Sequence, residues 1–90
     1  AVTLGPEGTR ANAISAGPVR TLAAAGIAGF KGLCGGFDAI APLRSNITID
    51  DVGRSALYLA ADLSNAVTGE VLYVDGGFNI VGVPTETAGS

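Results

Sequence analysis

The sequence contains no histidine, methionine or tryptophan and a single cysteine, Cys34. Without histidine, Ser-His and Cys-His nucleophilic catalysis are excluded. One thiol without histidine partners also assembles neither a metal site nor a disulfide framework. Cys34 lies among the glycines of residues 32–36 and has no cationic neighbour that would favour a reactive thiolate. We therefore interpret it as a structural or incidental thiol, consistent with a reducing cytoplasm.

Charge is also scarce: 14% of residues are charged, and the net charge is −3. Lysines and arginines form no cluster, so nucleic-acid binding has no electrostatic basis. Apolar runs are interrupted by charges, Gly or Pro long before the roughly 20 residues that a membrane-spanning helix needs. The composition therefore excludes nucleic-acid and membrane functions.

Apolar residues and glycine are abundant instead. Of the 90 residues, 48% are hydrophobic and 14 are glycine, and the mean hydropathy is +0.46. A domain this short leaves most side chains near water and normally carries more charge. We expect surfaces that pack against more of the same chain or against neighbouring subunits. Because residues 1–4 resemble neither a start with Met nor a signal peptide, we expect the chain to be part of a longer protein.

The hydrophobic pattern predicts two strands and one clear helix. Alternation indicates a strand within residues 9–15, and the uninterrupted apolar run at residues 71–74 indicates a strand buried on both faces, as in a parallel sheet. Between them, Thr48 can cap a helix whose interior is residues 52–63. Its apolar stripe comprises Val52, Ala56, Leu59, Ala60 and Leu63. This order of elements is an α/β pattern with right-handed crossovers. Because two strands cannot form a stable doubly wound sheet, we expect the remaining strands upstream.

Two segments follow strand ends and are therefore placed to meet a ligand: residues 15–24 and 75–79. Gly17 and Pro18 fix a tight turn, from which the carbonyl and amide of Val19 can project together. Thr21 offers a hydroxyl and a helix N-terminus, both suited to a pyrophosphate. The alternative interpretation is structural: a strand exit followed by a helix cap. The helix expected from residue 21 to 30 is weakened by glycines at 26 and 29.

Residues 5–24 (GPEGTRANAISAGPVRTLAA) resemble the bacterial NADH-dependent enoyl-[acyl-carrier-protein] reductases, divergent members of the short-chain dehydrogenase/reductase superfamily. The Ala-Gly-Pro order followed by Arg-Thr-Leu-Ala is the variant typical of these reductases. Residues 48–53 (TIDDVG) and 68–80 (TGEVLYVDGGFNI) match the same family in order and spacing. The resemblance implies an α/β fold: the C-terminal part of a Rossmann-like, doubly wound parallel sheet without its N-terminal nucleotide-binding half.

The resemblance further implies that the parent enzyme uses NAD(H) to reduce the trans-2 double bond of an enoyl chain on acyl carrier protein. Residues 1–83 would belong to one reductase domain, with 19–40 as a substrate-binding lid and 84–90 as a frayed tail. The implied cofactor-binding residues are Val19, Arg20, Thr21, Leu22 and Ala23. The implied substrate-binding residues are Ala23, Ala24, Ile27 and Phe30, although core packing is the alternative for the last two.

The family's catalytic Tyr-x6-Lys pair has no counterpart in this chain. Tyr58, expected in a helix, and Tyr73, expected in a buried strand, lack a lysine at suitable spacing. We therefore expect no catalytic residue here. The family also implies a cytoplasmic homotetramer with no metal. Two alternatives stay open: another reductase of the superfamily, such as one acting on 3-oxoacyl thioesters, or a non-catalytic fragment.

Overall fold

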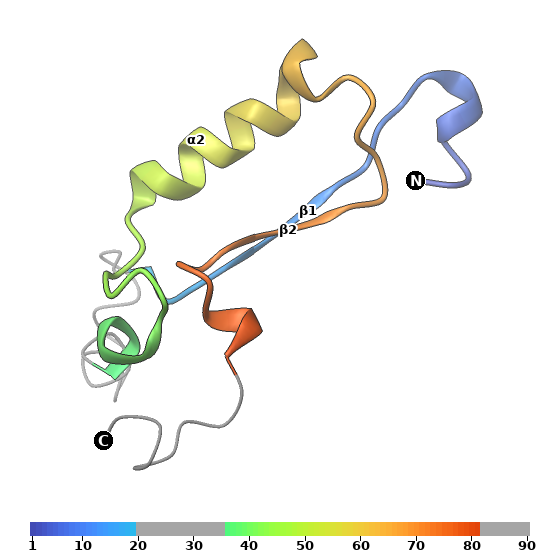
Figure 1. Cartoon of the computed structure of the whole chain (residues 1–90). Coiled ribbons are helices and arrows are strands. Elements are labelled where there is room, and N and C mark those ends of the chain that lie inside the picture. The colour runs from blue at the N-terminus through green and yellow to red at the C-terminus, as the bar shows by residue number, and fades with distance from the viewer. Residues whose placement is uncertain (20–35, 82–90) are drawn as a thin grey trace.

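The computed structural model describes residues 1–19 and 36–81. Its elements follow the chain in the order shown in Figure 1. They are the 3-10 helix η1 (Gly5–Glu7), the strand β1 (Ala13–Ala16), the helix α2 (Ile49–Ala60), the 3-10 helix η3 (Asp62–Ser64), the strand β2 (Val71–Val74) and the 3-10 helix η4 (Phe78–Ile80). Residues 36–40 are also helical.

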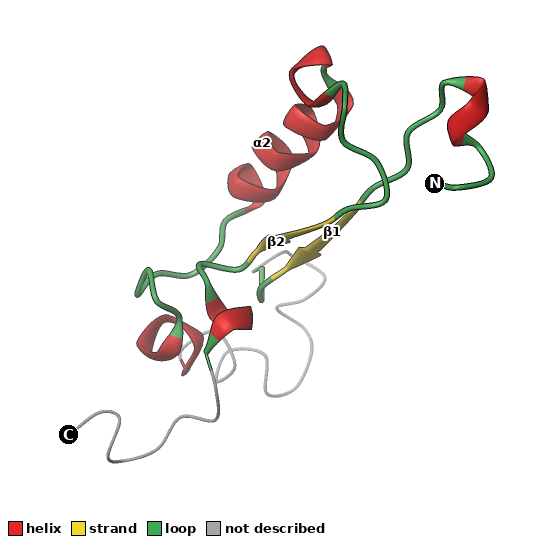
Figure 2. Cartoon of the chain, turned by 45° about the vertical axis from the view of Figure 1, so that its right-hand side comes forward, coloured by secondary structure: helices red, strands yellow, loops and turns green. Residues whose placement is uncertain are grey.

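The two strands form a parallel pair in the register Ala13–Val71 to Ala16–Val74. Figures 1 and 2 show α2 running along this pair, and α2 contacts both strands. This arrangement confirms the predicted α/β pattern and the parallel pairing. A strand, a helix and a parallel neighbouring strand constitute the crossover from which doubly wound sheets are built.

The first strand begins later than the alternation predicted, at Ala13 instead of near residue 9. Side chains hold the preceding residues: Asn12 donates from Nδ2 to the Val67 carbonyl and accepts from the Glu70 amide, at 3.0 Å in both cases. The Thr68 hydroxyl accepts from the amide of Ala11 at 3.1 Å. Side-chain bonds thus take part of the place of regular strand pairing before Ala13. The alternation of residues in the sequence does not reveal this difference.

The start of α2 agrees with the sequence. Thr48 Oγ1 accepts from the Asp51 amide at 3.1 Å, and Asp51 Oδ2 accepts from the Thr48 amide at 2.9 Å. This reciprocal capping box satisfies two amides that a helix start would otherwise leave unpaired. The backbone amide and hydroxyl of Thr48 lower the pKa of Asp51 below its ordinary value of 3.8, because both favour the carboxylate.

The end of α2 does not agree with the sequence. The helix stops at Ala60, where an extended Ala61 leads into η3, so the predicted continuation to residue 63 is wrong. Leu63 consequently leaves the apolar stripe and is 83% exposed. Ala56, Leu59 and Ala60 still face β1, where they line a shallow groove with Ile14.

Arg10 fixes this early helix end. Its two terminal nitrogens donate to the carbonyls of Leu59, Ala61 and Val67 and to both the carbonyl and the hydroxyl of Ser64, at 2.9–3.4 Å. Carbonyls at a helix C-terminus lack partners within the helix, and an arginine satisfies them with several donors at once. A residue just before β1 therefore binds the far end of α2 to the sheet.

Burial along β2 alternates, with Val71 and Tyr73 exposed and Leu72 and Val74 half-buried. The prediction that both faces of this strand are buried is therefore wrong for the described residues. The helix α2 covers one face, and no described segment covers Tyr73, which is 51% exposed. The core is small: Phe37, Ala41 and Ile47 are buried. Val19, Val52 and Val74 pack against them.

Within residues 1–19 and 36–81, no helix has both the length and the apolar character needed to cross a membrane.

Replacing Arg10 with methionine is expected to lower the free energy of unfolding by about 1–3 kcal/mol, because partly buried carbonyls lose their donors. The measurement is urea unfolding of the protein that carries this chain. Arg54→Met is the matched control, since Arg54 lies on the exposed side of α2. Equal stability of the two variants would contradict the role given to Arg10.

Asp51 makes the stability of α2 dependent on pH. Because its pKa is lowered in the folded state, its contribution is fully present above the ordinary value of 3.8 and is lost as the pH falls through the lowered pKa. Asp51→Asn is expected to reduce stability at neutral pH and to flatten the acid limb of the stability–pH curve. Asp50→Asn changes a first-turn residue outside the capping box, so the fall of stability at acid pH should remain as steep as in the unmodified protein.

Candidate functional site

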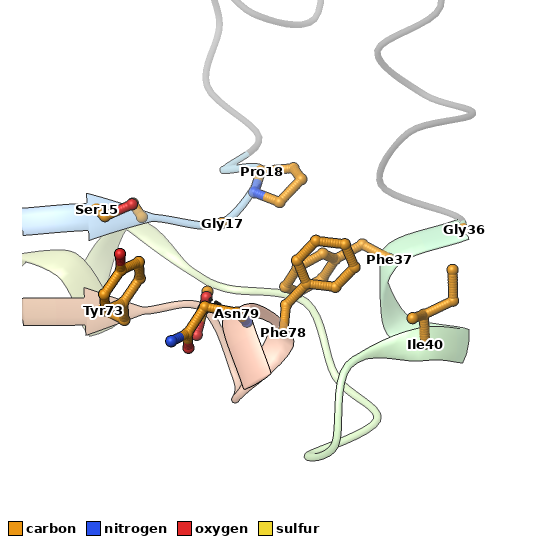
Figure 3. Close-up of a pocket in the computed structure, with 11 residues that line it drawn as sticks. Ser15, Gly17, Pro18, Gly36, Phe37, Ile40, Tyr73, Phe78 and Asn79 are labelled. Atoms are coloured by element: carbon orange, nitrogen blue, oxygen red, sulfur yellow. Dashed lines mark hydrogen bonds between the residues drawn. The ribbon is translucent and has the colours of Figure 1, made fainter. Parts of the chain in front are cut away.

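The site lies where the two strands end. Because β1 and β2 are parallel, the residues that follow both strands meet at one edge of the sheet, as the sequence predicted. They border a hollow of about 560 Å³ (Figure 3). Its lining is mostly apolar and comprises Ser15, Ala16, Gly17, Pro18, Gly36, Phe37, Ile40, Tyr73, Asp75, Phe78 and Asn79.

A turn built on Asp75 forms one side of the hollow. Asp75 is 7% exposed, and its two carboxylate oxygens accept from the amides of Gly77 and Asn79, at 3.0 Å each. Gly76 and Gly77 have φ angles of 63° and 92°, which side chains disfavour, so this turn needs glycine at both places. The turn confirms the sharp stop predicted after the second strand, and it starts η4 with Phe78 beside the hollow.

An aromatic pair forms another side. Phe37, from the helical residues 36–40, lies with its ring centroid 5.4 Å from that of Phe78 and tilted by 40°. Figure 3 shows the two rings together, next to the turn that contains Pro18. Phe37 is 5% exposed. Phe37 was not among the predicted site residues, because no local pattern in the sequence links Phe37 to Phe78.

Position 17 requires glycine for a reason that the sequence did not reveal. Glycine often occupies a turn because it tolerates positive φ, but Gly17 is not among the glycines with positive φ in the described residues. A Cβ at this position would instead lie 2.8 Å from Cζ of Phe37. The reason for glycine here is therefore the close approach of an aromatic ring.

Val19 is the one predicted cofactor-binding residue that the structure describes. It forms a parallel bridge with Ile47 and is half-buried against the cluster of Phe37, Ala41 and Ile47. The remaining predicted site residues lie outside the described residues; they are Arg20, Thr21, Leu22, Ala23, Ala24, Ile27 and Phe30.

The two tyrosines are separated. Tyr58 lies on α2, whereas Tyr73 borders the hollow. Neither lysine nor arginine appears among the described residues that line the hollow. Within the described lining of the hollow, Tyr73 thus has no cation that would assist proton transfer. In residues 1–19 and 36–81, no three acidic, Cys or His side chains come together as a potential metal site.

Parallel strands that end together at an apolar hollow, with a helix along the pair, define a ligand-binding α/β protein of the doubly wound class. The sequence profile of the enoyl-(acyl carrier protein) reductase family matches residues 1–79. The chain belongs to this family.

Curated relatives agree with this assignment. Over 77 residues the chain is 56% identical to the enoyl-[acyl-carrier-protein] reductase [NADH] FabI of Escherichia coli (strain K12), covering 86% of this chain and 29% of that protein. The Neisseria meningitidis protein of the same name is 55% identical over 86 residues, covering 96% of this chain and 33% of that protein. The chain thus spans about a third of the length of the curated relatives it matches.

Solved structures share the fold. The Bacillus cereus enoyl-acyl carrier protein reductase, crystallised with NADP+ and indole naphthyridinone, superposes with a TM-score of 0.86 at 46% identity, over 92% of this chain and 32% of that chain. The reductase of Anaplasma phagocytophilum, in complex with NAD, gives 0.82 at 44% identity, over 94% of this chain and 30% of that chain. The described strands and helix are therefore part of a Rossmann-like α/β sheet.

Asp75→Ala is expected to lower the free energy of unfolding by about 1–3 kcal/mol, because the amides of Gly77 and Asn79 lose their acceptors. Asp75→Asn should cost less, since an amide side chain keeps one acceptor oxygen. Urea unfolding of the protein that carries this chain measures both values. The control is Asp62→Ala, at an exposed position. If Asp62→Ala lowered the free energy of unfolding as much as Asp75→Ala does, the role given to the Asp75 turn would be contradicted.

Proposed function

We propose that the protein carrying this chain reduces the trans-2 double bond of an enoyl group on acyl carrier protein, using NADH, during fatty-acid elongation. The observation that carries the proposal is the family match over residues 1–79, together with 56% identity to a reductase named for NADH. The identity is spread over 86% of this chain, so it is not limited to one motif.

The position of the hollow and its mostly apolar lining support a nicotinamide cofactor. In open α/β sheets, ligands bind beyond the carboxyl ends of the strands, which is where the hollow lies. The carboxylate of Asp75 is held by the backbone amides of Gly77 and Asn79, which keeps the turn beside the hollow in one conformation. NADH would supply the hydride, and residues of this chain would hold the nicotinamide in position.

In this proposal the residues after β1 hold the cofactor. The backbone of Val19 would pair with the carboxamide of the nicotinamide, and the hydroxyl of Thr21 would bind the pyrophosphate. Arg20, Leu22 and Ala23 would complete the cofactor-binding loop. The half-buried, bridged position of Val19 supports this assignment, since it keeps the backbone in one place.

The acyl chain would meet the residues that come next. Ala23, Ala24, Ile27 and Phe30 would form its pocket within a substrate-binding segment, residues 19–40. Residues 1–83 would belong to one reductase domain, and 84–90 would form its tail. We place the proton donor outside this chain, because Tyr73 has no cationic partner among the described residues that line the hollow.

We also propose that the protein is a cytoplasmic homo-oligomer, a tetramer. Leu57 and Ile80 support an assembly, because these large apolar side chains are exposed on the described part of the chain.

The test uses two proteins: the complete protein that carries this chain, and a chimera in which this chain replaces the matching 77 residues of the Escherichia coli reductase. Both are expected to oxidise NADH when supplied with a crotonyl thioester of acyl carrier protein, as followed by NADH absorbance. Light scattering on the same preparations reports whether the particle mass is that of a tetramer.

Thr21→Val in the chimera removes one hydroxyl with little change of volume. It is expected to raise the KM for NADH about tenfold, which corresponds to the loss of one hydrogen bond to a charged group. Thr3→Val, at an exposed position near the N-terminus, is the control. Turnover of a 3-oxoacyl thioester with none of the crotonyl substrate would replace this proposal with the other reductase activity.

A further inference from the structure

We propose that Phe37 is a positioning residue for the cofactor: its ring, held by Phe78 and seated on Gly17, fixes the turn that presents the Val19 backbone. The inference rests on the function proposed above and deepens it. It assigns a role to a residue outside the matched motifs and gives a reason for glycine at position 17 of this chain.

The first step is the contact between Phe37 and Gly17. A Cβ built on Gly17 would lie 2.8 Å from Cζ and 3.2 Å from Cε1 of the Phe37 ring, and 3.1 Å from Cγ1 of Ile47. Separations of this size are far below ordinary van der Waals contact between carbon atoms. The ring therefore lies directly on the backbone of the turn, and a methyl group at Gly17 would displace it.

The second step is that the Phe37 ring has little freedom to move. It is 5% exposed and stacks at a tilt on Phe78, with centroids 5.4 Å apart. Phe78 in turn follows the turn whose amides are held by Asp75. Phe78 itself is 42% exposed beside the hollow, so the position of the Phe37 ring depends on its own burial and on its contacts with Phe78 and Gly17.

The third step connects the ring to the cofactor-binding backbone. Gly17 donates its amide to the Val74 carbonyl at 3.0 Å, which fixes one side of the turn to β2. Phe37 covers the turn, and Val19, two residues further on, packs against the same cluster. The position of the Val19 carbonyl and amide therefore depends on where this ring sits. Misplacement of a ligand-positioning group by about 1 Å can cost on the order of a hundredfold in rate.

The structure suggests a reciprocal test in the active chimera. Gly17→Ala is expected to raise both the Kd and the KM for NADH by about tenfold or more, because the new methyl group and the ring exclude each other. Phe37→Leu in the same chain removes the ring atoms at 2.8 and 3.2 Å and leaves only the 3.1 Å approach to Cγ1 of Ile47. The double variant should therefore recover to within about threefold of Phe37→Leu alone. Phe37→Leu alone should weaken NADH binding modestly, because the turn loses its support.

Gly53→Ala is the matched control for the glycine substitution. A Cβ at Gly53 meets nothing within 4 Å, so this variant should bind NADH as the unmodified chimera does. Thermal midpoints are recorded for all variants. A loss of stability with unchanged NADH binding in the folded fraction would overturn the positioning role and leave a purely structural one.

Two failures remain distinguishable. If the unmodified chimera binds NADH and reduces the crotonyl thioester, but Phe37→Leu does not rescue Gly17→Ala, this inference is wrong and the proposed function stands. If the unmodified chimera neither binds NADH nor turns over, the proposed function fails, and the inference fails with it.

Discussion

Parallel pairing between β1 and β2 is the constraint on which the rest of this structure depends. The bonds that begin and end it, from the Ala13 amide to the Glu70 carbonyl at 2.9 Å and from the Gly17 amide to the Val74 carbonyl at 3.0 Å, set the register. Because both strands run the same way, their following turns emerge at one edge. A shift of one residue would turn the side chains of the shifted strand to the opposite face and move its following turn away from the other turn.

The two ends of the strand pair are held by different chemistry. At the amino ends, Arg10 and Asn12 use polar side chains to join β1 to the segment between α2 and β2. At the carboxyl ends, Phe37 and Phe78 form an apolar contact. Asp75 holds the turn before Phe78 by accepting hydrogen bonds from the backbone amides of that turn. The apolar end is the one that borders the hollow, which suits a ligand with a flat ring or an alkyl chain.

Local signals in the sequence predicted a large part of this arrangement. The cap at Thr48 and the end of the second strand at residue 74 depend on neighbours in the chain, so the sequence alone was enough to place them. The reason for Gly17 was missed because it involves a ring distant in sequence, and the arginine contact to the end of α2 was missed for the same reason. The burial of β2 was overestimated because four consecutive apolar residues imply covering layers, and the described residues supply only one.

The acceptors of Arg10 have a consequence for the behaviour of this fold in salt. The guanidinium is bound by carbonyl and hydroxyl oxygens, all of them electrically neutral groups. Dissolved ions weaken attraction between opposite charges at a surface far more than they weaken short, directed bonds to partly buried dipoles. The joint between helix and sheet is therefore built to tolerate wide changes in ionic strength, although its only charged member is a single cation.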